Sequence, residues 1–281
     1  YEIITGLVGS EMCIRDRESD DPPAELYHFI GKDIMYFHCL FWPAQLMGYD
    51  PEIHLPDDVP ANQYITFKGG KASASRGVGL TIQEGLDLFQ ADGLRYALAA
   101  SFPEQADTDI SIEEIARRIN EELVATWGNL VNRVLSMVNK NFGEQPSVEG
   151  RTEADHAVLG AVDELLTTAN GQLERVELKA ALRTAMDAAQ AVNAYLNATE
   201  PWKVAKEDPQ RAGVLLGTAL DAINGVRIGF APFLPFSTEA LSEILGPIEG
   251  WSRVPVPTGT PIAKPTPIFT KVDVEALLAE D

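Results

Sequence analysis

Seven large apolar residues recur at three- and four-residue steps in the middle of the chain, and this run constrains the fold more than any other feature. They are Ile115, Ile119, Leu123, Trp127, Leu130, Val134 and Val138. The spacing places all seven on one face of a helix spanning about 112–141. Ser111 precedes the run and Glu114 follows three residues later, which predicts a capping box at the helix N-terminus.

Helical patterns continue beyond this run. We expect further helices at about 152–168, 172–197, 208–230 and 238–246, with breaks at prolines and at Gly171. These segments predict an all-α bundle of four or five antiparallel helices. The proline-rich stretch after Trp251 predicts an extended tail, followed by a short helix at about 273–279.

The preceding part of the chain has a different pattern. Residues 24–105 are typical of strand, helix, strand and helix, the closing part of an α/β sheet. The first strand is expected at 27–30, turning at Gly31 into a helix that Asp33 could cap. The second strand is expected at 64–67, followed by one helix over 81–100. The fold class is therefore mixed: part of an α/β domain followed by a helical bundle.

Composition narrows the function classes. The chain has 281 residues, 45% of them hydrophobic, and we find no uninterrupted apolar stretch long enough to span a membrane. Cys13 and Cys39 are too few and too far apart for a disulfide framework or a self-contained zinc site, so we expect a cytoplasmic protein. The formal net charge of −20 argues against nucleic-acid binding unless recognition is confined to a local patch or to unstacked bases.

The start of the sequence looks foreign to the rest. Residues 1–10 lack the basic region and sustained apolar core of a signal peptide. Residues 11–17 resemble translated sequencing-adapter read-through. We therefore interpret residues 1–18 as an artefact and the range 1–23 as an artefact or disordered start; a genuine flexible connection is the alternative.

Three groups of residues carry candidate chemistry. In the aromatic run 27–44, Ile34, His38 and Trp42 are spaced four apart, which places them on one helix face suited to an apolar small-molecule pocket. A buried amphipathic helix with a satisfied histidine is the alternative. The small, cationic segment 70–77 suits a polyphosphate, although flexible surface loops share this composition.

The third group lies in the bundle. Asn129 and Arg133 are one turn apart, where an amide can read a base edge and a guanidinium can stack or grip phosphate. Trp202 follows a proline and is flanked by Lys203 and Lys206, as expected of a base-stacking platform. A solvated helix face and a core tryptophan are the respective alternatives.

Taken in order, these motifs strongly resemble the second half of the methionyl-tRNA synthetases over about residues 24–281. The resemblance implies that Ile34, His38 and Trp42 surround the methionine side chain, and that Gly31 and Asp33 approach ATP. The segment 71–75 resembles the Lys-Met-Ser-Lys-Ser loop of class I aminoacyl-tRNA synthetases. Its matching residues, with the trailing arginine, are Lys71, Ser73, Ser75 and Arg76.

Alanines depart from that motif. Ala72 replaces its methionine, and Ala74 replaces a lysine that stabilises the triphosphate in the family. The resemblance further implies that Asn129, Arg133 and Trp202 meet the CAU anticodon of tRNA(Met). The implied organisation is a partial Rossmann-like catalytic domain at 24–110, an anticodon-binding domain at 111–250 and a tail at 251–281.

The implied activity is methionine–tRNA ligation with ATP and Mg²⁺. No His-Ile-Gly-His motif or Cys-x-x-Cys zinc knuckle is present, so we expect both, and the zinc site, in a missing N-terminal part. The fragment alone is expected to be inactive; methionine-dependent pyrophosphate exchange by this chain would contradict that. The alternatives are another class I synthetase and a non-enzymatic tRNA-binding helical module. We expect no metal site in this chain and a monomeric state.

Overall fold

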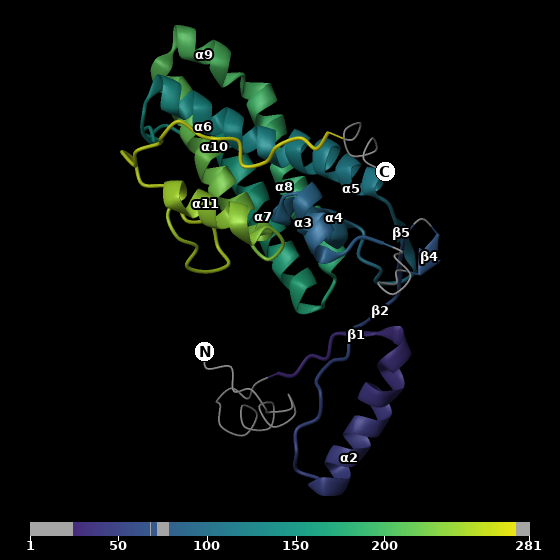
Figure 1. Cartoon of the computed structure of the whole chain (residues 1–281). Helices are drawn as coiled ribbons and strands as arrows, with labels where there is room; N and C mark the ends of the chain where they lie inside the picture. The colour runs from purple at the N-terminus through teal and green to yellow at the C-terminus, as the bar shows by residue number, and fades with distance from the viewer. Residues whose placement is uncertain (1–24, 68, 72–78, 274–281) are drawn as a thin grey trace. The chain divides into compact units, whose positions relative to one another are not determined.

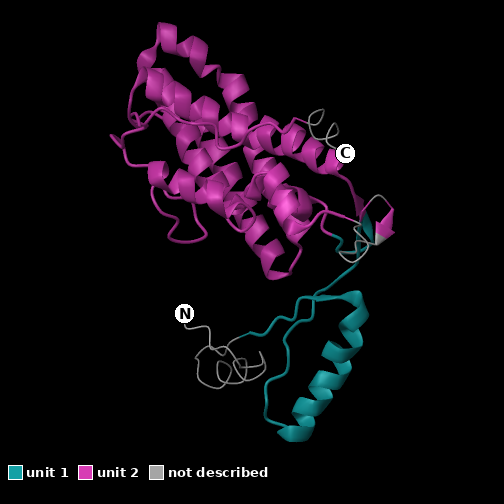
Figure 2. Ribbon diagram, viewed as in Figure 1, with its two compact units in different colours: residues 1–66, 103–108 teal, residues 67–102, 109–281 magenta. Residues whose placement is uncertain are grey.

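The computed structural model describes residues 25–67, 69–71 and 79–273 (Figure 1). The described chain divides into two compact units (Figure 2). Unit 1 comprises the described residues up to Thr66 together with Pro103–Thr108. Unit 2 comprises the described parts of 67–102 and of the chain from Asp109 onward. The suspect start at 1–23, including Cys13, lies outside the described residues.

Unit 1 contains two parallel strands joined by a helical crossover. Strand β1 (Ile30–Gly31) pairs with β2 (Ala61–Asn62), and Ile30 stands opposite Ala61. Between them lie a 3-10 turn η1 (Lys32–Ile34), a π-helical turn η2 (Phe37–Phe41) and α2 (Trp42–Tyr49). A parallel pair needs such a crossover because a tight turn cannot join its strands.

The local prediction at the start of this crossover is partly wrong. The expected strand over 27–30 is reduced to Ile30–Gly31, with an isolated bridge from Tyr27 to Asp58. Asp33 does not cap the helix, because Gly31 holds the N-cap position without any side-chain cap. Asp33 lies inside the 3-10 turn instead, where its carboxylate accepts a hydrogen bond from the Tyr64 hydroxyl.

A second sheet has three strands in the order β4-β3-β5: Gly70–Lys71, Ile65–Phe67 and Thr108–Ile110. The strand predicted at 64–67 is therefore confirmed within one residue, whereas β5 was not predicted. Its short, polar sequence Thr-Asp-Ile lacks the alternation that marks a longer strand.

Two helices replace the single helix predicted over 81–100. They are α3 (Ile82–Leu88) and α4 (Ala91–Ala100). Thr81 begins α3 with a capping box that includes Glu84. Phe89 then adopts an extended conformation and buries its ring, at 3% exposure, which explains why the helical pattern is interrupted there.

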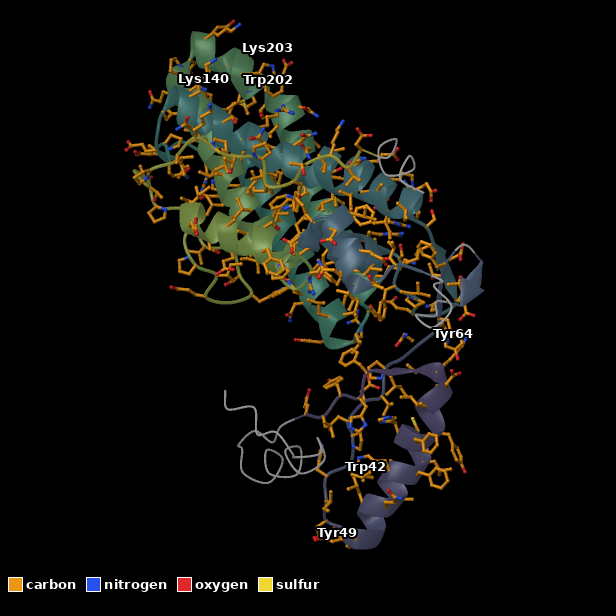
Figure 3. The ribbon with its side chains drawn as sticks, viewed as in Figure 1. Trp42, Tyr49, Tyr64, Lys140, Trp202 and Lys203 are labelled. Carbon is orange, nitrogen blue, oxygen red and sulfur yellow. The ribbon has the colours of Figure 1, made fainter. Side chains whose placement is uncertain are left out.

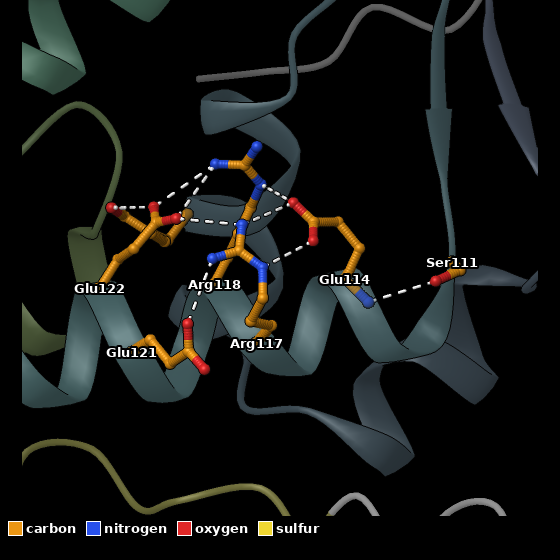
Figure 4. A network of polar contacts seen from close by, with 7 residues as sticks. Ser111, Glu114, Arg117, Arg118, Glu121 and Glu122 are labelled. Atoms are coloured by element: carbon orange, nitrogen blue, oxygen red, sulfur yellow. Dashed lines mark hydrogen bonds and ion pairs between the residues drawn. The ribbon is translucent and has the colours of Figure 1, made fainter.

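The long helix predicted over 112–141 is confirmed as α5 (Ile112–Arg117), a π-helical segment η4 (Arg118–Gly128) and α6 (Asn129–Asn141) in direct succession. All seven apolar residues of its predicted face are buried, each at 3% exposure or less. Ser111 caps it through the Glu114 amide, as predicted. The reciprocal half of the capping box is absent, because the Glu114 carboxylate binds Arg117 and Arg118 instead (Figure 4).

Within the described residues, the bundle contains five more helices: α7 (Glu153–Glu174), α8 (Leu178–Thr199), α9 (Pro201–Glu207), α10 (Pro209–Phe230) and α11 (Pro235–Leu245). Helix α7 continues through Gly171, so the break predicted there is wrong; the chain turns instead at Val176, whose φ is 58°. Every residue of α10 from Ala212 to Phe230 is buried, so this helix forms the centre of the bundle. No described helix is both long and apolar enough to cross a membrane.

The tail after Trp251 runs over the bundle in an extended conformation, as predicted. The Trp251 indole donates to the Leu166 carbonyl at 2.8 Å, and the backbone N–H of Gln145 donates to the Thr260 carbonyl at 2.8 Å. Gly225 of α10 permits this packing, because a Cβ there would lie 2.9 Å from the Arg253 side chain. The terminal helix predicted at 273–279 lies outside the described residues, apart from Asp273.

Candidate functional site

His38 and Trp42 face the same hollow on the crossover helix of unit 1 (Trp42 is labelled in Figure 3). The hollow has a volume of about 480 Å³ and is lined by Phe37, His38, Phe41, Trp42 and Gln45. Ile34 does not line it and is 42% exposed. The π-helical turn between Phe37 and Phe41 interrupts the regular four-residue register on which the predicted Ile34–His38–Trp42 face depended.

His38 has a partner that the sequence analysis did not identify. Its Nδ1 lies 3.1 Å from Nδ1 of His28, and the two rings meet edge to face. One nitrogen must donate and the other accept, so at least one imidazole is neutral in this contact. His28 lies in the same aromatic run, but only the fold of β1 against the helix brings it next to His38.

A polar cluster surrounds the start of the same helix. Asp33 accepts from the Tyr64 hydroxyl, and this hydrogen bond raises the tyrosine pKa. Lys32 lies over the Tyr64 ring at 4.3 Å and pairs with Asp107 at 2.7 Å. The lysine holds the pKa of the Asp107 carboxyl below its usual range. Sequence reasoning identified Asp33 here but missed Lys32, Tyr64 and Asp107.

The space around Gly31, next to this cluster, is open. A Cβ added at Gly31 would meet no atom within 4 Å, so the position offers room for close approach from that side. No group of three or more His, Cys, Asp or Glu among the described residues could hold a metal ion.

The proposed phosphate loop is only partly described. Strand β4 ends at Lys71, and Gly69, at a φ of 76°, forms the turn that precedes it. The Gly69 amide donates to the Asp109 carboxylate at 2.8 Å. The other predicted loop residues, Ser73, Ser75 and Arg76, lie outside the described residues, as do Ala72 and Ala74.

The bundle brings Arg133 of α6 and Trp202 of α9 into direct contact. The Arg133 guanidinium carbon lies 4.4 Å from the centre of the Trp202 ring, within the range of a cation–π interaction. Trp202 is half-buried, so it is neither a core side chain nor a fully exposed ring. Asn129 is exposed one turn before Arg133, and its amide nitrogen donates to the Ala125 carbonyl at 3.3 Å.

A third helix contributes a residue that was not predicted. Asn197 of α8 accepts hydrogen bonds from both terminal nitrogens of Arg133, at 3.3 and 3.4 Å. Lys203, beside Trp202 in Figure 3, is exposed and pairs with Glu200 at 2.7 Å. Glu200, at a φ of 44°, forms the left-handed turn that starts α9 and so sets the position of Trp202.

Two family models match consecutive parts of the chain. The family described as tRNA synthetases class I (M) matches residues 17–135. The family described as the anticodon binding domain of methionyl tRNA ligase matches residues 145–278. Together these matches cover the described part of unit 1, most of the long helix and helices α7 to α11.

Curated relatives agree with both matches. The chain is 38% identical to the methionine–tRNA ligase of Roseiflexus castenholzii over 301 residues, covering 96% of this chain and 50% of that protein. It is 35% identical to the methionine–tRNA ligase of Kineococcus radiotolerans, covering 93% of this chain and 51% of that protein. The chain thus spans about half the length of the curated relatives it matches.

Solved structures show the same likeness. Mycobacterium tuberculosis methionyl-tRNA synthetase bound by methionyl-adenylate superposes with a TM-score of 0.79 at 30% identity, over 88% of this chain and 50% of that one. The apo form of the same synthetase gives a TM-score of 0.77 at 28% identity, over 89% and 50% of the two chains.

Proposed function

Because the chain belongs to the methionyl-tRNA synthetase family, we propose that it forms part of a methionine–tRNA ligase. The observation that carries this proposal is the order of the two family matches, a class I synthetase domain at 17–135 followed by an anticodon-binding domain at 145–278. A catalytic match on the same chain favours an enzyme over a tRNA-binding bundle alone. Residues 24–110 would contribute to the catalytic domain, 111–250 would bind the anticodon, and 251–281 would form the tail.

The reaction has two steps. The methionine carboxylate attacks the α-phosphorus of ATP, and pyrophosphate leaves as methionyl-adenylate forms. A hydroxyl of the terminal tRNA ribose then attacks the methionyl carbonyl carbon, and AMP leaves. Both steps depend on positioning and charge stabilisation more than on an acid–base pair.

The methionine side chain is proposed to enter the hollow beside His38 and Trp42, whose apolar lining suits a thioether. Ile34 would contribute only from the edge, since it does not line the hollow. Gly31 and Asp33 would approach the ATP ribose, where a carboxylate can accept from a hydroxyl.

Lys71, Ser73, Ser75 and Arg76 would bind the triphosphate, with two cations in place of the motif's larger set because position 74 is alanine. Mg²⁺ would enter with ATP, bound to its phosphate oxygens, and would help to neutralise the charge on the triphosphate. We further propose a cytoplasmic monomer.

Anticodon recognition is proposed for Asn129, Arg133 and Trp202. An unpaired base can stack on an indole, and amide and guanidinium groups can hydrogen-bond base edges. Reading unstacked bases requires few phosphate contacts, which reconciles RNA binding with the acidic chain. The net charge of −20 would also suppress non-specific RNA binding.

An RNA stem-loop with a CAU loop tests this proposal on the chain itself. We expect it to bind more tightly than a stem-loop with a scrambled loop. Trp202→Ala should weaken CAU binding by about 5- to 150-fold, because stacking one base contributes roughly 1–3 kcal/mol. Asn170→Ala on α7, which removes a surface side-chain hydrogen bond to Glu174, is the control and should leave CAU binding unchanged. Equal affinity for both loops would contradict the proposal.

A further inference from the structure

Asn197 is the one member of the three-helix contact around Arg133 that the sequence did not single out. Its carboxamide oxygen accepts from both terminal nitrogens of the guanidinium, and the guanidinium carbon lies over the Trp202 ring, 4.4 Å from its centre. Asn197 is exposed and Trp202 is half-buried, so the contact lies at the surface and not in the core. A flexible arginine is thereby held in one orientation before any ligand binds.

The donors that remain on Arg133 have a defined geometry. A guanidinium carries five N–H bonds, and an acceptor placed between the two terminal nitrogens uses one from each. The Nε–H and the neighbouring terminal N–H remain as a parallel pair along the side edge. This pair matches two adjacent acceptors, such as two oxygens of a phosphate or the paired acceptors of a base edge.

The neutrality of Asn197 is equally important. A carboxylate at this position would accept the same hydrogen bonds but would cancel the arginine charge that attracts RNA. An amide orients the guanidinium without neutralising it. Trp202 likewise supports the cation through its ring without a counter-charge.

We propose that Asn197 is a positioning residue of the anticodon site, holding the Arg133 guanidinium against Trp202 with its side edge free for RNA. This inference rests on the proposed function for its consequence, but the positioning itself can be measured without RNA. Asn197 acts through Arg133 and is not assigned a direct contact with RNA.

The RNA-free measurement uses the chain labelled with ¹⁵N-arginine. Stacking on Trp202 should shift the Arg133 Nε–H proton resonance through the indole ring current, with Arg133→Lys identifying the signal by its loss. Asn197→Ala and Trp202→Ala should each move that resonance to the position of a free arginine. Asn170→Ala on α7, which also removes a surface asparagine hydrogen bond, should leave it in place. An unchanged resonance in Asn197→Ala would overturn the inference.

The RNA measurement uses the CAU stem-loop in a double-mutant cycle. Asn197→Ala should weaken binding about 5- to 10-fold in the wild-type background and less than about 2-fold in Arg133→Ala. Equal effects in both backgrounds would overturn the inference, because Asn197 would then act independently of Arg133. Asn197→Asp should keep the shifted resonance but bind the stem-loop as weakly as Arg133→Ala does. The slope of log K against log salt concentration should also become shallower by about one, the change expected for one lost phosphate contact.

The two proposals fail differently. If the chain binds CAU and scrambled loops equally while Asn197→Ala still releases Arg133, the anticodon function is wrong and the positioning is right. If CAU binding depends on Trp202 but the resonance and the cycle show no coupling to Asn197, the anticodon function stands and the present inference is wrong.

Discussion

Unit 1 and the helical bundle formed by α5 to α11 use apolar side chains for opposite purposes. In the bundle, the apolar positions at helical spacing are buried, and Trp127 packs on Phe230 with ring centres 5.0 Å apart. In unit 1, only Ile30 and Leu46 are deeply buried among the described large apolar side chains, each at 5% exposure. The aromatic side chains of Tyr36, Phe37 and Phe41 in the crossover helix are exposed, and their rings contact one another.

This difference shows that apolar side chains form two kinds of surface in the same chain, a buried core and an exposed apolar patch. Where apolar residues recur at helical spacing, they are buried in a core. Where they crowd without a regular period, as between Tyr36 and Phe41, they form an exposed surface of the kind that ligands and partners cover. The residues proposed to bind methionine therefore lie in a region with little core of its own, whereas those proposed to read the anticodon lie on a bundle with a large buried core.

The largest expected effect comes from removing the buried carboxylate that joins three helices of the bundle. Asp155, fully buried in α7, accepts from the Tyr195 hydroxyl of α8 at 2.5 Å and from Arg211 of α10 at 2.6 and 3.0 Å. Asp155→Ala leaves a guanidinium and a phenol without their partner and should lower the free energy of unfolding by about 3–5 kcal/mol. Urea unfolding followed by circular dichroism measures this. Asp187→Ala, at an exposed position of α8, should change it by less than about 0.5 kcal/mol.

The same carboxylate sets an acid limit on the bundle. Burial alone would raise its pKa, but hydrogen bonds from Arg211, Tyr195 and Thr152 outweigh burial and hold the pKa well below its usual range. Stability from a depressed pKa is complete above the unfolded value, about 3.9, and is lost as pH falls toward the folded value. Wild type should therefore lose stability relative to Asp155→Ala below about pH 4. A constant difference between the two proteins down to pH 2 would contradict this network.

The sequence predicted the bundle better than unit 1 for a physical reason. The face from Ile115 to Val138 is a local pattern, and all seven of its residues are buried. The break between α3 and α4 was missed because Phe89 leaves the helix to bury its ring, a tertiary gain that overrides local propensity. Gly171 was mistaken for a break because glycine only weakens a helix interior and does not stop it.

The candidate site was predicted residue by residue but not contact by contact. Arg133 and Trp202 were chosen for their chemistry, and their stacking across α6 and α9 depends on the turn at Glu200. Asn197 and His28 carry no sequence signal of their own, since only the fold brings them to Arg133 and His38. The roles of these residues toward methionine, ATP and tRNA stay predictions.

A substitution within the small core of unit 1 sharpens the comparison. Leu46→Ala should cost about 2–3 kcal/mol, at the low end for a buried leucine because its neighbours on α2 are exposed. With so little other core, unit 1 should then open locally, and the amides of β1 and α2 should exchange hydrogen about 30- to 150-fold faster. Amides of α10 should exchange at the wild-type rate. A parallel loss of protection in α10 would show that the two regions unfold as one and would break the comparison.

The smallest expected effect concerns α3, a helix of unit 2 whose only buried residue is Gly85. Like unit 1, this helix contributes few side chains to a core. Its start depends on Thr81, whose hydroxyl accepts from the Glu84 amide at 3.2 Å, while the Glu84 carboxylate accepts from the Thr81 amide at 2.7 Å. Thr81→Ala should destabilise α3 by about 1 kcal/mol, and its amides should exchange about fivefold faster. Thr81→Ser keeps the cap and should restore protection. Because Ile82 and Leu86 are exposed at 80% and 43%, packing cannot compensate for a lost cap; unchanged exchange in Thr81→Ala would mean that α3 is held by contacts more like those of the bundle.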